Sequence, residues 1–220
     1  MKFVTYSNFG GTPLLDLCHE SFKRSLPGET LVVYCFDRAT VDHCLKGGMV
    51  PVLWADWEPG EYHRWAEDPS SVYQKLTRQK YMMFKHALAG GTQALCFDAD
   101  VVHLEDVRPH LLSLPEGLHC SVVISGSFNT GMQYFNNVPA HYFDMLIEGM
   151  RYDESALNSD HNAKKLHAHA LDKVLFSNPR YGEVPEGCAM LHYPGSGDLA
   201  SKKGMLERAY RKHVAAKLTP

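Results

Sequence analysis

Residues 94–102 read Ala94-Leu95-Cys96-Phe97-Asp98-Ala99-Asp100-Val101-Val102. The apolar half of this stretch predicts a buried strand, and two carboxylates, Asp98 and Asp100, appear where that strand ends. Ligands in open α/β sheets bind at the carboxyl ends of the strands. Two carboxylates one residue apart can hold a hard divalent cation, which keeps several waters and accepts phosphate oxygens as further ligands. The stretch therefore indicates a metal-bridged diphosphate site; the alternative is a pair that caps a helix or faces solvent in a turn.

Strands and helices alternate along the first half of the chain. The pattern predicts strands at 3–6, 31–36, 50–54 and 94–97, and helices at 14–26, 40–45 and 70–89. Pro51 marks the third strand as an edge strand. Such alternation implies a mostly parallel sheet with helices on both faces.

The second half departs from this alternation. Closely spaced strands at 121–124 and 132–135 indicate an antiparallel or mixed addition to the sheet, and a last strand is expected at 190–193. Helices are expected at 141–150, 163–176 and 202–218, the last of them basic. The expected fold class is α/β, a single domain with a mostly parallel mixed sheet flanked by helices.

Composition excludes several classes of protein. The chain has 220 residues, 45% of them hydrophobic and 21% charged, which is typical of one globular domain. A net charge of −3 without a basic stripe argues against nucleic acid as a partner. No run is long and apolar enough for a transmembrane segment, and the first residues are too short and polar for a signal peptide. Six scattered cysteines without a Cys-x-x-Cys pair indicate reduced core residues, so a cytoplasmic location is expected.

Lys80 is an unusual charge in the helix that precedes the acidic pair. With Leu76 as the origin of a helical wheel, Lys80 falls about 40° away, inside the apolar stripe that includes Met83. A lysine on a core face is costly unless it snorkels to water or meets an anion. Snorkelling is the simple explanation, and the alternative is contact with a carboxylate or phosphate at the strand end. Arg78, near the start of the helix, can also reach over such a site.

Three further groups carry suitable chemistry. Asn129 and Thr130 precede a strand and offer the donors and acceptors that sugar hydroxyls require, although an ordinary turn has the same composition. His192 ends a strand and can complete an Asp/Asp/His site suited to Mn²⁺. Gly195 allows backbone N–H groups to approach phosphate, and Lys202 can neutralise a diphosphate.

Two features have alternative explanations. Asp172 sits among apolar residues as either a catalytic carboxylate or a salt-bridged helix residue. An aromatic-rich loop at 54–65 is either a platform for a sugar ring or a lid at the edge of the core. The sequence contains no nucleophile elbow, no Walker loop and no Gly-x-Gly-x-x-Gly motif.

In order and spacing, these segments resemble the metal-dependent GT-A glycosyltransferases, which use nucleotide-diphosphate sugars. The resemblance spans roughly residues 1–205 and rests on four segments: 85–102 with its Asp-x-Asp, 128–135 with its Asn-Thr-Gly, 170–172, and His192-Tyr193-Pro194-Gly195. Two departures matter. Lys173 stands where many members have Gln, which puts the role of Asp172 in question, and the Lys-Pro-Trp common after the histidine segment is absent, which does the same for Lys202.

The resemblance implies a GT-A (Rossmann-like) single domain over residues 1–220. Its nucleotide-binding half would be 1–102, its acceptor and metal-completing half 103–200, and its C-terminal helix 201–220. It implies Mn²⁺ or Mg²⁺ on Asp98, Asp100 and His192, with Asn129 and Asp172 as catalytic residues. The donor-binding residues it implies are Thr5, Tyr6, Asp37, Arg78, Lys80, Asp98, Ala99, Asp100, Thr130, Gly195 and Lys202.

The implied reaction moves a sugar from a nucleotide-diphosphate sugar, with a UDP-sugar favoured, to a hydroxyl of a glycan or glycoconjugate. Inversion would need a base, for which Asp172 is the candidate, whereas retention could use a phosphate oxygen; the histidine segment leans towards families that retain. One rival is a sugar-nucleotide pyrophosphorylase, whose Gly-rich basic signature residues 8–12 do not supply. The other is a non-catalytic nucleotide- or sugar-binding module.

Overall fold

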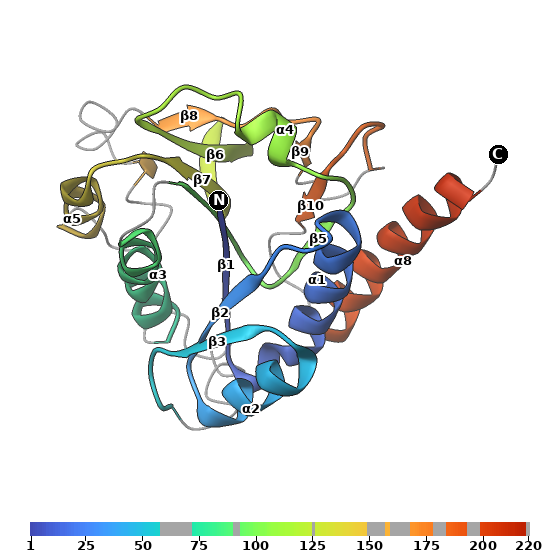
Figure 1. Ribbon diagram of the computed structural model, residues 1–220, viewed down its shortest axis with the longest axis horizontal. Helices are drawn as coiled ribbons and strands as arrows, with labels where there is room; N and C mark the ends of the chain where they lie inside the picture. The colour runs from blue at the N-terminus through green and yellow to red at the C-terminus, as the bar shows by residue number, and fades with distance from the viewer. Residues whose placement is uncertain are drawn as a thin grey trace.

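A computed structural model describes residues 1–57, 72–89, 93–124, 126–148, 157–158, 168–177, 184–192 and 199–218, without the side chains of 72–78 and 218. Its main sheet has seven strands in the order β3-β2-β1-β4-β7-β6-β8 (Figure 1). These strands are β1 Lys2–Ser7, β2 Leu31–Cys35, β3 Val50–Leu53, β4 Gln93–Phe97, β6 Leu118–Ile124, β7 Ser127–Asn136 and β8 Ala168–Ala170. Only β7 runs antiparallel to both of its neighbours in this sheet, so the mostly parallel mixed sheet expected from the sequence is confirmed.

Strands β2 and β4 are almost entirely apolar because helices cover both faces of the sheet. Along β1, Phe3 packs into one core with α1 (Thr12–Ser25) and α2 (Arg38–Gly47). The next residue, Val4, packs into a second core with α3 (Val72–Leu88) and α5 (Ala140–Glu148). This alternation follows from the two-residue period of a strand. Figure 1 shows α1 and α3 on opposite sides of β1.

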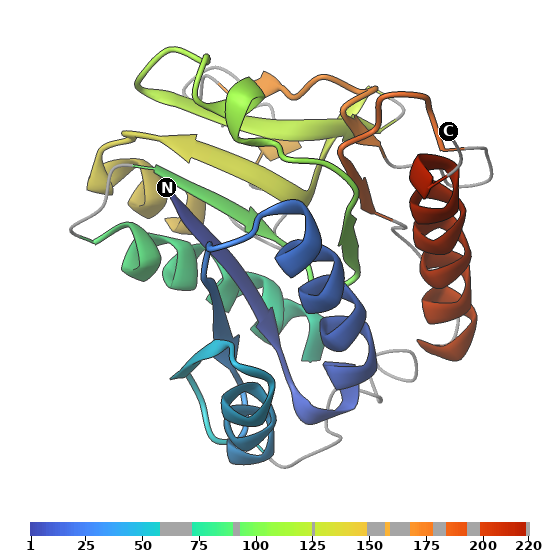
Figure 2. The ribbon, with the colours of Figure 1, turned by 45° about the vertical axis from the view of Figure 1, so that its right-hand side comes forward.

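The chain also forms a second, smaller sheet. It has the order β5-β10-β9 and consists of β5 Val101–His103, β10 Met190–His192 and β9 Phe176–Ser177. Two short helices, η1 (Phe9–Gly11) and α4 (Arg108–Leu111), lie outside the two sheets. Helix α8 (Leu199–Leu218) packs Leu206 and Tyr210 against Leu14 and Leu17 of α1 (Figure 2). The two sheets meet where β4 leads into β5.

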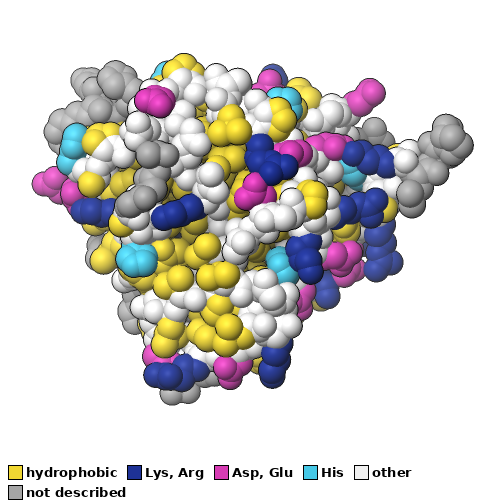
Figure 3. Space-filling view, viewed as in Figure 1, with side chains coloured by type: hydrophobic (Ala, Val, Ile, Leu, Met, Phe, Trp, Pro, Cys, Tyr) yellow, Lys and Arg dark blue, Asp and Glu magenta, His cyan; other side chains and the backbone are white. Residues whose placement is uncertain are grey.

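The expected basic helix at the C-terminal end is confirmed. Its outward side carries exposed Arg208, Arg211, Lys212 and Lys217, and Figure 3 shows basic side chains along this part of the surface. No helix in the described part of the chain has the length and apolarity that crossing a membrane requires.

Local sequence signals place several boundaries. Gly48 ends α2 in the left-handed conformation (φ 77°), a geometry that glycine adopts without the steric cost of a side chain. Strand β3, with its proline, lies at the edge of the sheet as expected. All six cysteines are free and buried, as predicted for core residues.

The helix expected at 163–176 is wrong over its described part. Residues 168–170 form β8, which pairs in parallel with β6, and residues 173–175 form a turn before β9. The reason lies at Asp172, whose Oδ1 accepts hydrogen bonds from the backbone N–H of Val174 (2.8 Å) and Leu175 (3.1 Å). An aspartate that bonds the backbone two and three residues later favours a turn over a continuous helix.

Candidate metal and donor-binding site

The acidic pair lies at the junction of the two sheets. Strand β1 has β2 on one side and β4 on the other, so the chain order reverses at β1, the kind of point where open α/β sheets bind ligands. Asp98 follows β4 at this point, and Asp100 precedes β5. His192 ends β10 and is paired in register with Val101, the residue after Asp100. The strand pairing thus brings the histidine segment to the acidic pair.

Three ligand atoms converge between these side chains. The Nε2 atom of His192 lies 3.2 Å from Oδ1 of Asp100 and 3.8 Å from Oδ2 of Asp98. One ligand atom from each of the three residues lies within 4.8 Å of the other two. Among the described residues, no other group of three or more His, Cys, Asp or Glu side chains has this closeness.

The opposite oxygen of Asp98 is held by the protein. Its Oδ1 accepts hydrogen bonds from Lys80 Nζ (2.8 Å) and the Tyr6 hydroxyl (2.6 Å). Lys80 is only 1% exposed; its Nζ also donates to Thr130 Oγ1 (3.3 Å) and lies 5.5 Å from the centre of the Tyr6 ring. The apolar-face lysine therefore meets a carboxylate at the strand end, which was one of the two explanations open from the sequence.

The two oxygens of Asp100 also have different partners. Its Oδ2 forms an ion pair with Nζ of Lys202, which comes from the first turn of α8. Burial raises the pKa of Asp100, but the neighbouring His192 and Lys202 outweigh burial and hold that pKa well below its ordinary value. Asp100 is therefore an ionised, largely buried carboxylate whose Oδ1 faces Nε2 of His192.

Gly131 makes room for the histidine. A Cβ atom on Gly131 would lie 2.1 Å from Cε1 and 2.4 Å from Nδ1 of His192, so the imidazole rests against this backbone. The carbonyl of Gly131 also accepts a hydrogen bond from the backbone N–H of Asp98 (2.9 Å). The sequence analysis included this glycine in the Asn-Thr-Gly segment but placed it before the strand and gave it no role of its own, although glycine inside a strand signals a close approach.

Asn129 and Thr130 lie on either side of the strand that carries Gly131. Thr130 is buried and faces Lys80, whereas Asn129 is half-buried and its Oδ1 accepts from the Gly131 N–H (3.0 Å). The Asn-Thr-Gly segment thus adjoins the triad on both faces of β7, and the ordinary-turn explanation is wrong because residues 127–136 form a strand.

Three residues expected to bind the donor, Thr5, Tyr6 and Asp37, make their observed contacts within the protein. Thr5 is fully buried, and Tyr6 contacts Asp98 instead. Asp37 is 1% exposed and caps α2: Oδ1 accepts from the N–H and hydroxyl of Thr40, and Oδ2 from the N–H of Phe9. Because these bonds engage both oxygens of Asp37, its observed contacts are those of a helix cap that holds the loop after β1.

Phe9 is a residue of this region that sequence reasoning missed. Its side chain is 47% exposed at the carboxyl end of β1, and its backbone is fixed by Asp37. An exposed aromatic ring at this edge of the sheet is available for stacking. Its position was not evident from the sequence because no local pattern marks an exposed phenylalanine as functional.

The remaining predicted site residues lie in different places. Ala99 is in the turn between the two ligand carboxylates and is partly exposed. The Arg78 side chain and Gly195 lie outside the described residues, as do residues 58–71, which hold most of the aromatic-rich loop. Asp172 is exposed and follows β8. Strands β8, β6 and β4 run in the same direction, so Asp172 and Asp98 lie at the same edge of the sheet. Strand β8 is three strands away from β4, which separates the two residues by roughly 14 Å at the usual strand spacing.

The donor set is suited to a divalent cation. The Oδ1 atom of Asp100 is buried and faces Nε2 of His192 at 3.2 Å, with no further partner among the described residues, and the Nδ1 atom of His192 has no hydrogen-bond partner among them. A buried, ionised oxygen with so few polar neighbours is costly, and a cation would stabilise it. Two carboxylates and an imidazole form a mixed hard and borderline set that suits Mn²⁺, with room for Mg²⁺.

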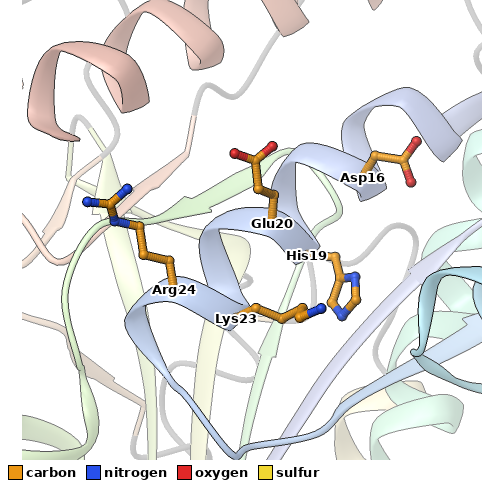
Figure 4. Close-up of a pocket in the computed structure, with 5 residues that line it drawn as sticks. All are labelled: Asp16, His19, Glu20, Lys23 and Arg24. Atoms are coloured by element: carbon orange, nitrogen blue, oxygen red, sulfur yellow. The ribbon is translucent and has the colours of Figure 1, made fainter. Parts of the chain in front are cut away.

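A surface hollow of about 510 Å³ lies elsewhere, along α1. Its described lining is Asp16, His19, Glu20, Lys23 and Arg24, and Figure 4 shows all five side chains projecting from that one helix. None of the triad residues lines it. Two acidic and two basic side chains give it no net preference for a charged ligand.

Comparison with known proteins places this geometry in a recognised architecture. No protein-family model matches the chain, and no curated protein matches it. Solved structures of glycosyltransferases do match it over almost its whole length, and the chain has the GT-A fold.

The galactosyltransferase LgtC, in complex with donor and acceptor sugar analogues, shares 14% identity over 96% of both chains, with a TM-score of 0.60. A glycosyltransferase involved in glycosylation of the major capsid of PBCV-1 shares 14% identity over 94% of this chain and 100% of that one, with a TM-score of 0.58. The bifunctional glycosyltransferase WbbM matches 96% of this chain with half of its own length (52%), at 10% identity and a TM-score of 0.62.

Proposed function

We propose that this protein is a metal-dependent glycosyltransferase that moves a sugar from a nucleoside-diphosphate sugar to a hydroxyl of a glycan or glycoconjugate. The observation that carries the proposal is the convergence of Asp98, Asp100 and His192 at the topological switch point of a GT-A fold. The structural neighbours LgtC and WbbM are named as glycosyltransferases, which supports the same reaction class. We favour Mn²⁺ as the cation and a UDP-sugar as the donor.

The reaction places negative charge on the diphosphate oxygen that leaves the sugar. A divalent cation held by Asp98 Oδ2, Asp100 Oδ1 and His192 Nε2 would supply Lewis-acid stabilisation of that charge. Lys202 is the described cation best placed to share this task, because its ammonium already lies at the edge of the triad on a partly exposed side chain.

Lys80 would position the metal ligand Asp98 rather than contact the donor sugar nucleotide. Its Nζ is buried beneath Asp98, where it bonds Oδ1 and leaves Oδ2 directed towards His192. Tyr6 donates to the same oxygen and fixes the carboxylate from the side of β1. Both residues therefore orient a metal ligand, a task that tunes affinity in many metal sites.

The nucleoside would lie over the carboxyl ends of β1 and β2. Phe9 offers an exposed ring for a base, and Asp37 supports the backbone of that loop. Thr5 would contribute through packing because its side chain is fully buried.

Asn129 and Asp172 would serve the sugar and the acceptor. Hydrogen bonds from the Val174 and Leu175 N–H groups lower the pKa of Asp172, so its carboxylate is ionised at neutral pH. A lowered pKa makes a weak general base and a good stabiliser of positive charge. Asp172 would thus stabilise an oxocarbenium-like sugar more readily than it would deprotonate an acceptor.

The test is turnover with a panel of nucleotide sugars in the presence of Mn²⁺, measured as release of nucleoside diphosphate. Release that stops with EDTA, and that is lost in a folded D100A variant, supports the proposal. Binding of nucleoside diphosphates without any turnover would favour the non-catalytic module, and no binding at all would remove the donor site.

The free, buried cysteines support a reducing compartment, and we propose the cytoplasm.

A further inference from the structure

The triad carries a balanced set of charges before any cation binds. Each carboxylate has its own lysine: Asp98 is paired with Lys80, and Asp100 with Lys202. Each carboxylate also keeps one oxygen for the point shared with His192. The four formal charges sum to zero in a setting where Lys80 is fully buried and Asp100 nearly so.

This balance opposes a metal ion that arrives alone. A divalent cation would bring two positive charges next to two lysines, and such repulsion is poorly screened at buried positions. A diphosphate linked to a nucleoside and a sugar carries one negative charge on each phosphate. Metal and diphosphate together would therefore restore the neutrality that metal alone disturbs.

Lys202 is the lysine free to change partner. Lys80 is held by Asp98, Thr130 and the Tyr6 ring and is 1% exposed. The Lys202 side chain is 18% exposed, stands in the first turn of α8 and makes an ion pair with Asp100.

Building on the proposed function, we propose that Lys202 is a resident counter-ion that couples the binding of metal and diphosphate. In the metal-free protein it neutralises Asp100 and disfavours a lone divalent cation. When metal and donor enter together, its ammonium moves from Asp100 to the diphosphate. The two ligands then bind as a pair, and by linkage each raises the affinity for the other by the same factor.

The experiment measures Mn²⁺ affinity by electron paramagnetic resonance of the free ion, first without nucleotide. We expect the K202M variant to bind Mn²⁺ at least about tenfold more tightly than the unmodified protein, because a competing cation has been removed. K202R keeps the charge and should match the unmodified protein. K203M is the matched control, since Lys203 pairs with Glu207 on the same helix and should leave the affinity unchanged.

The second arm repeats the titration with saturating UDP as the diphosphate probe. UDP should raise Mn²⁺ affinity in the unmodified protein, and this gain should shrink at least about tenfold in K202M. Equal or weaker Mn²⁺ binding by folded K202M without UDP, or an unchanged gain with it, would overturn the inference while leaving the metal site intact. Absence of Mn²⁺ binding in every variant would instead overturn the metal site on which the proposed function rests.

Discussion

Replacing Gly131 with alanine probes the link between the Asn-Thr-Gly strand and the metal histidine. The added Cβ would lie 2.1 Å from Cε1 of His192, where real contacts essentially never fall below 3.0 Å. The φ angle of Gly131 lies outside the left-handed region, so the cost comes from contact and not from backbone strain. The imidazole must move by about 0.9 Å or more, well beyond the ±0.2 Å that metal–ligand distances tolerate.

Two effects of G131A follow. Overpacking of this kind costs about 1–3 kcal/mol, which urea denaturation can measure. Misplacing the histidine should weaken Mn²⁺ binding by about 10- to 100-fold, as the loss of ligand orientation does in other metal sites.

A double-mutant cycle with H192A separates the ring contact from other effects. In the H192A background the clash disappears, so G131A should cost less than about 0.5 kcal/mol and should not lower Mn²⁺ affinity further. The reasoning is refuted if G131A costs the same in both backgrounds, or if it leaves Mn²⁺ affinity unchanged in a protein that still has His192.

Four further predictions address other parts of the account. Burial lowers the pKa of His103 to about 3, so on acidification this histidine is protonated in the unfolded chain before it is protonated in the folded protein. Its contribution to the free energy of unfolding is therefore retained above pH 6.5 and lost as the pH falls towards 3, by roughly 2–3 kcal/mol at pH 4.5. H103M should remove that loss in urea titrations, since neither ring nitrogen has a partner among the described residues; an unchanged pH dependence would contradict this. K80M should destabilise the fold by about 1–3 kcal/mol, and the surface control K85M by less than about 0.5 kcal/mol. Equal losses of stability would show that the buried ion pair of Lys80 contributes no more than an exposed one. D172N keeps an oxygen for the turn, so it should retain stability yet lower turnover by about 100-fold or more, and full turnover would reduce Asp172 to a turn residue. F9A should raise the donor KM about tenfold with little change in kcat; an unaltered KM would exclude stacking.

The fold was largely predictable because its strands are short apolar runs that end at polar residues. The run before Asp98 is buried on both faces of the sheet, so it contains no alternation and stands out in the sequence. Helical periodicity marked Lys80 as a charge inside an apolar stripe and left two explanations open, snorkelling or contact with an anion. The triad followed once His192 was placed at the end of a strand.

Other features depend on contacts that no local pattern encodes. The closeness of Gly131 and His192 joins strands from two different sheets, 61 residues apart in the chain. The 163–176 helix failed because apolar spacing was weighed above the turn chemistry of Asp172. The helix cap at Asp37 differs from these features because it is local: the Asp-x-x-Thr spacing with Thr40 indicates it in the sequence, and the donor role of Asp37 stays a prediction.

The most direct test of the central claim is a crystal structure of the protein with Mn²⁺ and UDP, with the ion located by its anomalous scattering. We expect one strong peak within about 2.0–2.3 Å of Asp98 Oδ2, Asp100 Oδ1 and His192 Nε2, with the Lys202 ammonium on the diphosphate. A peak elsewhere, or bound UDP without a metal and with Lys202 still on Asp100, would contradict it.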